Sequence, residues 1–356
     1  MSEIRATEHS NLTVLIKSLT ELNGPSGEEG PVLDAMTALW EDAGLRVEHS
    51  QIGNLLGRAG GSGPKLLLAA HADELCYLVR AIDPAGYLWL ANGQSWVRSA
   101  GLRNAFTIGT PVRILARGGS LPGYIAAVTG HLASLVLREP TELTWNDFWV
   151  DTGLSREELL QRGVRPGTRI IWEATTRPVG GHLVGKAFDD RVALAVMTEV
   201  VRRVSAAERR WDVTLAATVQ EEIGVIGAAA LAAREQFSVA IVVESGLAGD
   251  VPQAGETTMP VSLGGGPVLV HKDSLVHYDH TLTARLERCA AGCGVGIQHA
   301  VFGSFGSDGS AFMKADIPTA LVAFPTRYTH TPFETADERD IAGLVDWLCA
   351  FVRDEG

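Results

Sequence analysis

The apolar residues of the chain follow two rhythms that occupy different blocks of the sequence. Before residue 74 and after residue 184, short apolar runs alternate with segments of helical period. Because an unbroken apolar run has no polar face, it indicates a strand that is covered on both sides, as in a parallel sheet. The runs that predict such strands are 65–70, 212–219, 239–243 and 318–324.

Helical periodicity marks the segments between these runs. Their apolar side chains recur at intervals of three and four residues, which places them on one side of a helix. Segments 47–52 and 54–58 are short and alternating instead, and they predict a hairpin. The expected helices are 11–22, 32–43, 192–204, 228–233 and 336–352.

Between about residues 75 and 175 the pattern changes to short alternating runs separated by Gly and Pro. Such runs predict a small β-barrel or sandwich. One helix is expected inside this block, with Ser155 as its N-cap and Glu158 completing a capping box. The simplest organisation is an α/β domain made of residues 1–73 and 176–356, with residues 74–175 inserted as a second domain.

Composition indicates a globular chain and argues against two classes of binding partner. Of the 356 residues, 46% are hydrophobic and 20% are charged, which is ordinary for a folded protein. The net charge of −12 argues against a nucleic-acid or anionic-membrane surface, because both require clustered Lys and Arg. We therefore expect neither a nucleic-acid partner nor a membrane partner.

The cysteines and the first residues of the chain bear on location. Cys289 and Cys293 are the one close pair, and no second pair completes a zinc site, so reduced thiols are expected. Residues 1–5 lack the apolar core of a signal peptide, and no window approaches about 20 uninterrupted apolar residues. These features predict a cytoplasmic protein.

Side chains that can bind metals stand where the predicted strands end. His71, Glu222, Glu244 and His330 each follow such a strand, and sites in open α/β sheets lie outside the carboxyl ends of the strands. Any one of them alone would be an ordinary polar loop residue. Asp189 adds a fifth position just before a helix, and its two carboxylate oxygens can bridge two metal ions. The five positions together favour a metal centre.

Two further carboxylates suit a hydrolytic metal site. Asp73 stands two residues after His71 and can accept the second ring N–H of a metal-binding imidazole. Glu221 and Glu222 leave a strand as neighbours, so one can bind metal while the other faces the activated water. A solvated acidic loop is the plainer alternative. A glycosidase pair fits less well, because its carboxylates need about 5 Å or more between them.

Five stretches together carry a resemblance to a known family. They resemble the tetrahedral aminopeptidases, the glutamyl and deblocking aminopeptidase family of dinuclear metallopeptidases, and the resemblance covers nearly the whole chain. The stretches are 25–29 (PSGEE), 71–74 (HADE), 185–191 (GKAFDDR), 219–224 (VQEEIG) and 327–332 (RYTHTP).

The resemblance implies a fold and an activity. The fold is an α/β/α catalytic domain with a central mixed sheet, of the co-catalytic zinc peptidase type, plus a small inserted β-barrel of PDZ-like form. The activity is that of a metal-dependent aminopeptidase that removes N-terminal residues from short peptides. A metal-dependent amidase or deacylase with the same site, or an inactive shell-forming homologue, is the alternative.

The resemblance also implies roles for the site residues. Two divalent metal ions are expected in each subunit, zinc or cobalt, with manganese as an alternative. Glu221 and Asp73 would be the catalytic residues, with Glu221 as the general base, and the peptide bond from Asp189 to Asp190 would be cis. The expected ligands are His71 and Glu244 for one ion, Glu222 and His330 for the other, and Asp189 for both.

Two further positions need comment: one departs from the family pattern, and the other matches it but has an ordinary structural interpretation. Relatives usually carry Asp where this chain has Glu244, which is one methylene longer but still an oxygen ligand. Asp308 matches a family Asp near the site, but we interpret it as a turn carboxylate.

Assembly is the last property that the resemblance implies. Family members assemble twelve subunits into a tetrahedral shell, so a homododecamer built from dimers is expected. The inserted β domain resembles their dimerisation domain, which also shapes substrate access.

Overall fold

The computed structural model describes residues 12–93, 108–128, 132 and 145–354. By its internal contacts the chain separates into two compact units. The first unit contains residues 1–74, 175–329 and 333–356, and the second contains residues 75–174 together with the short segment 330–332. Among the described residues, no helix combines the length and the apolar character needed to cross a membrane.

A large mixed sheet forms the centre of the first unit, as the sequence predicts. Four neighbouring strands, β12, β3, β13 and β16, run parallel, and antiparallel strands flank them. A two-strand branch, β14 and β15, leaves the sheet at β16. In sheet order the strands are β1 (Arg46–His49), β2 (Leu55–Gly60), β12 (Asp212–Thr218), β3 (Lys65–His71), β13 (Val239–Leu247), β16 (Thr319–Arg327), β17 (Glu334–Ala336), β11 (His182–Gly185) and β10 (Arg177–Val179), with β14 (Val268–Lys272) and β15 (Gln298–Val301) on the branch.

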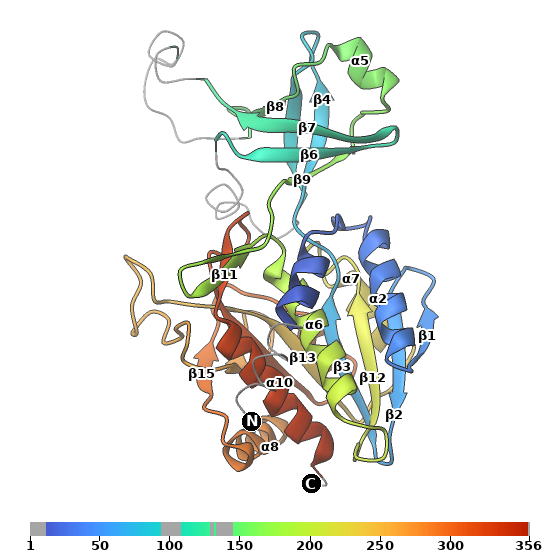
Figure 1. Cartoon of the computed structure of the whole chain (residues 1–356), viewed down its shortest axis with the longest axis vertical. Coiled ribbons are helices and arrows are strands. Elements are labelled where there is room, and N and C mark those ends of the chain that lie inside the picture. Colours follow the sequence, from blue (N-terminus) through green and yellow to red (C-terminus); the bar gives the residue numbers. More distant parts are fainter. Residues whose placement is uncertain (1–11, 94–107, 129–131, 133–144, 355–356) are drawn as a thin grey trace. The chain divides into compact units, whose positions relative to one another are not determined.

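Helices cover both faces of this sheet, and Figure 1 shows α6 and α10 crossing the same face. The side chains of β3 alternate between two apolar cores, which explains its unbroken apolar run. Leu66 and Leu68 pack in the core that includes α2, α6, α8 and α10, whereas Leu67 and Ala69 pack in the core that includes α7 and α9. The helices are α2 (Gly30–Asp42), α6 (Phe188–Arg203), α7 (Ile226–Ala232), α8 (His280–Cys293), α9 (Gly309–Lys314) and α10 (Glu338–Arg353), and residues 12–20 are also helical.

Two strand ends differ from the sequence prediction. β13 continues through Glu244 to Leu247, so Glu244 lies inside the strand and not after it. β16 likewise continues to Arg327. The cause is mutual pairing, because the two strands stay in parallel register as far as Leu247 and Thr326. A prediction from apolar periodicity ends a strand at its last apolar residue. The backbone hydrogen bonds between β13 and β16 continue past that residue, so the strands are longer than predicted.

The second unit is a closed barrel, which confirms the predicted small β fold. Helix α5 (Arg156–Gln161) in this unit begins as expected: the Ser155 hydroxyl accepts from the Glu158 N–H, and the Glu158 side chain accepts from the Ser155 N–H. In barrel order the strands are β4 (Tyr77–Ile82), β5 (Leu88–Asn92), β8 (Trp149–Asp151), β7 (Gly119–Ala126), β6 (Pro111–Ala116) and β9 (Arg169–Trp172).

Truncating Leu68 to alanine is expected to lower the free energy of unfolding by about 2–5 kcal/mol, because it opens a cavity in the core beneath β3. Leu275→Ala is the matched control, since that side chain is 39% exposed and its loss is expected to change stability by about 0.5 kcal/mol or less. Urea unfolding of the two variants tests this, and equal midpoints would contradict the burial argument.

Candidate active site

Three neighbouring parallel strands bring the predicted site residues to one edge of the sheet. His71 is the last residue of β3 and pairs with Thr218, the last residue of β12. Glu221 and Glu222 follow β12 directly. On the other side of β3, β13 pairs with it in parallel, and Glu244 lies on β13 close to its carboxyl end. The site therefore lies at the carboxyl ends of the strands, as such sheets favour.

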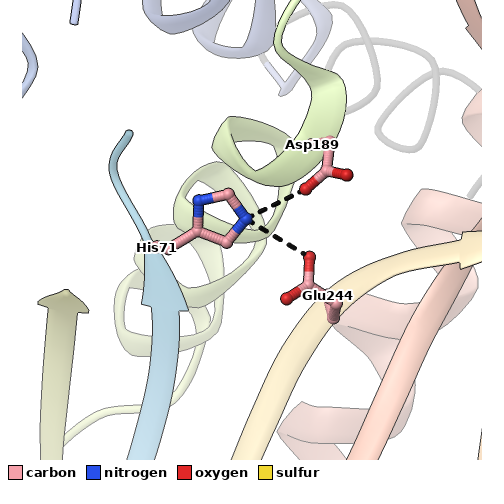
Figure 2. Close-up of side chains that lie close together, drawn as sticks. All are labelled: His71, Asp189 and Glu244. Carbon is pink, nitrogen blue, oxygen red and sulfur yellow. Dashed lines mark hydrogen bonds and ion pairs between the residues drawn. The ribbon is translucent and has the colours of Figure 1, made fainter. Parts of the chain in front are cut away.

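The first side-chain group consists of His71, Asp189 and Glu244, and Figure 2 shows the imidazole directed toward both carboxylates. The Nε2 atom of His71 lies 2.9 Å from Asp189 Oδ1 and 3.6 Å from Glu244 Oε1. All three side chains are buried, and all three residues belong to the first unit. One imidazole nitrogen and two carboxylate oxygens are a donor set that suits zinc and similar ions.

Asp189 also belongs to a second group, with Glu222 and His330. Within the first unit, Asp189 and Glu222 each offer a carboxylate oxygen to this group, and these two atoms lie within 4.8 Å of one another. A carboxylate common to both groups is what a bridging ligand requires. The roles of the five residues as ligands, and that of Asp189 as the bridge, stay predictions.

The backbone around Asp189 departs from a helix although it lies in the first turn of α6. Its ψ is 101°, and the peptide bond to Asp190 is cis, as expected from the sequence. Glu334 on β17 fixes this turn: its Oε2 accepts from the N–H groups of Phe188 at 2.6 Å and Asp189 at 3.2 Å. The sequence analysis did not single out Glu334, because nothing local connects it with a segment almost 150 residues earlier.

Asp73 joins the two ligand-bearing strand ends. Its carboxylate lies 3.3 Å from Nδ1 of His71, which is the contact expected from the sequence. The same carboxylate accepts from the N–H groups of Glu221 at 3.0 Å and Glu222 at 3.3 Å, and from the Ser26 hydroxyl at 2.6 Å. Burial opposes its charge, yet these contacts hold the pKa of Asp73 below its usual value. Asp73 therefore remains ionised and orients both His71 and the Glu221 loop.

Glu221 is buried at the same edge but belongs to neither group of ligand-type side chains. Burial raises its pKa well above the usual value, and the nearby charges of Glu222 and Asp308 raise it further. A buried carboxyl with a raised proton affinity, next to but outside the ligand groups, has the properties of a general base.

Asp308 lies in a turn, as the sequence interpretation predicts, but its carboxylate does not serve that turn. The side chain is buried and makes no cap bond to α9. The Thr218 hydroxyl donates to its Oδ2 instead, at the end of β12. Burial raises the pKa of Asp308 to about 6. Only the family match pointed to this position, since a Gly-Ser-Asp-Gly stretch by itself is typical of a turn.

The electrostatics of this edge favour cations. Burial raises the pKa of Glu244 to about 8. The pKa of Asp190 is also well above its usual value, because of burial and the nearby charge of Glu244. Burial alone would lower the pKa of His71, but Glu244, Asp189 and Asp73 outweigh it. Buried oxygens of Asp190 and Asp308 lack a hydrogen-bond partner within the described part of the chain. Divalent cations at the two groups fit this surplus of carboxylates.

A doubly covered α/β sheet with histidine–carboxylate groups at its edge is typical of one class of protein, the metal-dependent hydrolases. Residues 53–346 match the M42 glutamyl aminopeptidase family, and the chain belongs to that family. The protein is thus an aminopeptidase, a hydrolase of peptide bonds, and metal dependence is typical of its family.

Relatives and solved structures agree with this assignment over almost the full length. The lysyl aminopeptidase of Pyrococcus furiosus is 28% identical over 341 residues, which cover 93% of this chain and 94% of the relative. The structure of aminopeptidase APDkam598 from Desulfurococcus kamchatkensis is 26% identical, with a TM-score of 0.89, and covers 97% of this chain and 95% of that one. The Pyrococcus horikoshii TET1 peptidase, which can assemble into a tetrahedron or a large octahedral shell, is 26% identical, with a TM-score of 0.84, and covers 96% and 99%.

Removing bound metal with a chelator is expected to lower the thermal unfolding midpoint, because the carboxylates of these groups can then relieve their mutual repulsion only by taking up protons, as the raised pKa of Glu244 indicates. Each ion present at 100 times its Kd contributes about 2.7 kcal/mol to stability. Calorimetry with and without a chelator, followed by restoration of the metal, measures the effect. An unchanged midpoint after verified metal removal would contradict the electrostatic argument.

Proposed function

We propose that this aminopeptidase holds two divalent metal ions, one at His71, Asp189 and Glu244 and the other at Asp189, Glu222 and His330. The observation that carries the proposal is the sharing of Asp189 by two histidine–carboxylate groups at the carboxyl ends of the central strands. Imidazole and carboxylate ligands suit zinc, cobalt and manganese, with zinc or cobalt preferred. Glu244 supplies an oxygen ligand in place of the aspartate that is usual in the family.

The catalytic roles follow from how the side chains are held. Two such ions, when bound, lower the pKa of water and polarise the scissile carbonyl. The Glu221 carboxylate takes the proton of the attacking water and delivers it to the leaving amine. Asp73 supports this role, because it fixes the backbone N–H of Glu221 and the ring of His71 from the same carboxylate.

The proposed substrates are short peptides with a free amino terminus. Aminoacyl p-nitroanilides and their N-acetylated counterparts, assayed with Zn²⁺, Co²⁺ or Mn²⁺, test this choice. We expect turnover of the free amines only. Turnover of blocked substrates alone would replace the proposal by an amidase or deacylase, and no turnover of either set with two ions bound would indicate an inactive homologue.

We also propose a homo-oligomer, with dimers joined through the barrel unit and assembled into a dodecamer. Support comes from the similarity to the TET1 peptidase over 96% of this chain. Light scattering coupled to size exclusion tests it, and the expected mass is twelve times the 37.9 kDa of one chain. A monomeric mass at micromolar concentration would exclude the assembly.

A cytoplasmic location is part of the proposal. All four cysteines are free thiols, which suits a reducing compartment. Fractionation of cells that produce the protein, with activity measured in each fraction, tests the location.

A further inference from the structure

A buried ion cluster lies beside the two segments that carry His71 and Asp189. It consists of Glu74, Lys186 and Arg191, which we call the Glu74 clamp. The Glu74 carboxylate lies 2.6 Å from Lys186 Nζ and 3.1 Å from Arg191 Nη2. All three side chains are almost completely buried. Two cations and one anion thus share a site from which water is excluded, and none of the three belongs to the ligand-type groups.

The clamp connects segments that are far apart in the sequence. Glu74 comes three residues after His71, whereas Lys186 and Arg191 stand on either side of Asp189. The pairing therefore holds the turn of Asp189 from both sides against the end of β3. Arg191 adds a second link, because its Nε donates to the carbonyl of Ala72 at 3.3 Å.

The remaining donors of Arg191, and one further donor of Lys186, are also used. Arg191 donates to the carbonyls of Leu19, Leu22 and Gly24, and Lys186 donates to that of Leu22 at 3.1 Å. Burial opposes the charge on Glu74, yet Lys186 and Arg191 hold its pKa below the usual value, so the carboxylate stays ionised. The clamp is accordingly a charged network whose donors have defined partners.

Such a network is a poor means of adding stability, because apolar residues of the same volume often stabilise a core as well or better. Its distinct property is sensitivity to geometry, since a displacement that breaks a pair leaves a buried charge unpaired. A device of this kind is useful where two chain segments must keep a fixed separation. Here the two segments carry the histidine and the carboxylate that meet at 2.9 Å.

We propose that Glu74 is a positioning residue that, through Lys186 and Arg191, fixes the separation of His71 and Asp189 and so preforms the metal-binding group that they share with Glu244. The inference rests on the proposed two-metal function and extends it beyond the ligands. Glu74 contacts neither substrate nor ion in this role. It acts through the backbone of the two segments.

The main test is Glu74→Gln, which keeps the size of the side chain and removes its charge. Substitution of groups that support metal ligands typically weakens metal affinity by about 10- to 100-fold, and we expect a loss in this range. Calorimetric titration of the full-length, metal-free protein with Zn²⁺ gives the affinity, and the visible absorption of the Co²⁺ form reports ligand geometry. The Co²⁺ spectrum is expected to change, and kcat to recover partly at high metal concentration.

A second variant disturbs the clamp without removing a charge. A Cβ at Gly24 would lie 2.8 Å from Arg191 Nη2 and 2.6 Å from Val32 Cγ2, so Gly24→Ala requires the guanidinium, Val32 or the backbone at Gly24 to shift. The backbone of Gly24 itself contacts the clamp, since its N–H donates to Glu74 and its carbonyl accepts from Arg191. We expect a weaker metal affinity in the same direction as for Glu74→Gln. If Glu74→Gln does not fold, as judged by circular dichroism, Gly24→Ala decides the question.

Arg58→Met is the matched control, because it removes a partly buried ion cluster on β2 that is not connected to the clamp. Arg58 lies 2.7 Å from Glu48 and 2.5 Å from Glu235. Its loss is expected to lower stability while changing metal affinity by less than about twofold. If Glu74→Gln behaves in the same way, with a lower unfolding midpoint but unchanged metal affinity and Co²⁺ spectrum, the positioning role is wrong.

The outcome also separates this inference from the function on which it rests. If the wild-type chain binds two ions and the Glu74→Gln chain binds them equally well, the positioning role of Glu74 is wrong and the proposed metal site stands. If Asp189→Asn leaves metal binding unchanged, the proposed metal site is wrong, and the positioning role of Glu74 is wrong with it.

Discussion

Replacing Glu221 by glutamine is expected to lower kcat by about 10²- to 10⁴-fold, the usual contribution of a general base, while both metal ions stay bound. Glutamine keeps the volume of the side chain but cannot take a proton from water. Because Glu221 lies outside both ligand-type groups, the proposed function assigns its charge no part in holding the ions. Steady-state kinetics on an aminoacyl p-nitroanilide, combined with metal analysis of the purified variant, measures the two quantities independently.

The neighbouring residue provides the control for this experiment. Glu222→Gln changes the same kind of side chain one position further on, but Glu222 belongs to the group with Asp189 and His330. Its metal content is therefore expected to fall together with its activity. If Glu221→Gln loses metal and Glu222→Gln does not, the two roles are assigned the wrong way round.

Asp189→Asn is expected to reduce metal binding at both groups and to lower kcat/KM by about 10³-fold or more. Lewis-acid stabilisation by bound metals contributes several kcal/mol, and each 1.36 kcal/mol corresponds to a factor of ten. Asparagine retains one carbonyl oxygen but loses the negative charge that both groups share. Metal analysis after dialysis and calorimetric titration with Zn²⁺ determine the number of ions and their affinities.

Asp190→Asn is the matched control for the bridging role. Asp190 is also buried and adjacent, but it belongs to neither group, and its Oδ2 accepts from the backbone N–H of His71 at 3.3 Å. A smaller loss of metal affinity is expected, since asparagine can still accept that hydrogen bond. If Asp190→Asn loses both ions and Asp189→Asn keeps them, the bridge has been assigned to the wrong residue.

The strands and the barrel could be predicted from sequence because each depends on a local pattern. The run at 65–70 has no polar face, and β3 is covered by a core on each side. Ser155 and Glu158 are three residues apart, and their capping box forms as the spacing requires. The gathering of His71 and Glu244 was predictable at a coarser level, because carboxyl ends of parallel strands share one edge of a sheet. Asp189 lies in the first turn of a helix, and only the family resemblance assigned it to the same ion as these two residues.

Features that depend on distant pairing could not be predicted in this way. The extension of β13 beyond Glu244 depends on its register with β16, some 80 residues later. Asp308 resembles a turn residue until Thr218 is known to lie against it. Glu74 and Arg191 are ordinary charged residues in the sequence, and only the folded chain shows that they meet in the core. Each case needs a partner that no local window contains.

The sharing of Asp189 by two groups has a thermodynamic consequence for loading. Under the proposed function, the two ions do not bind independently. Occupation of one group changes the charge and orientation of the Asp189 carboxylate that the other group must use. Linkage makes that influence reciprocal: the first ion alters the affinity of the second by the same factor as the second alters that of the first. Titrations with two different metals should therefore give one cooperativity factor, whichever metal is added first.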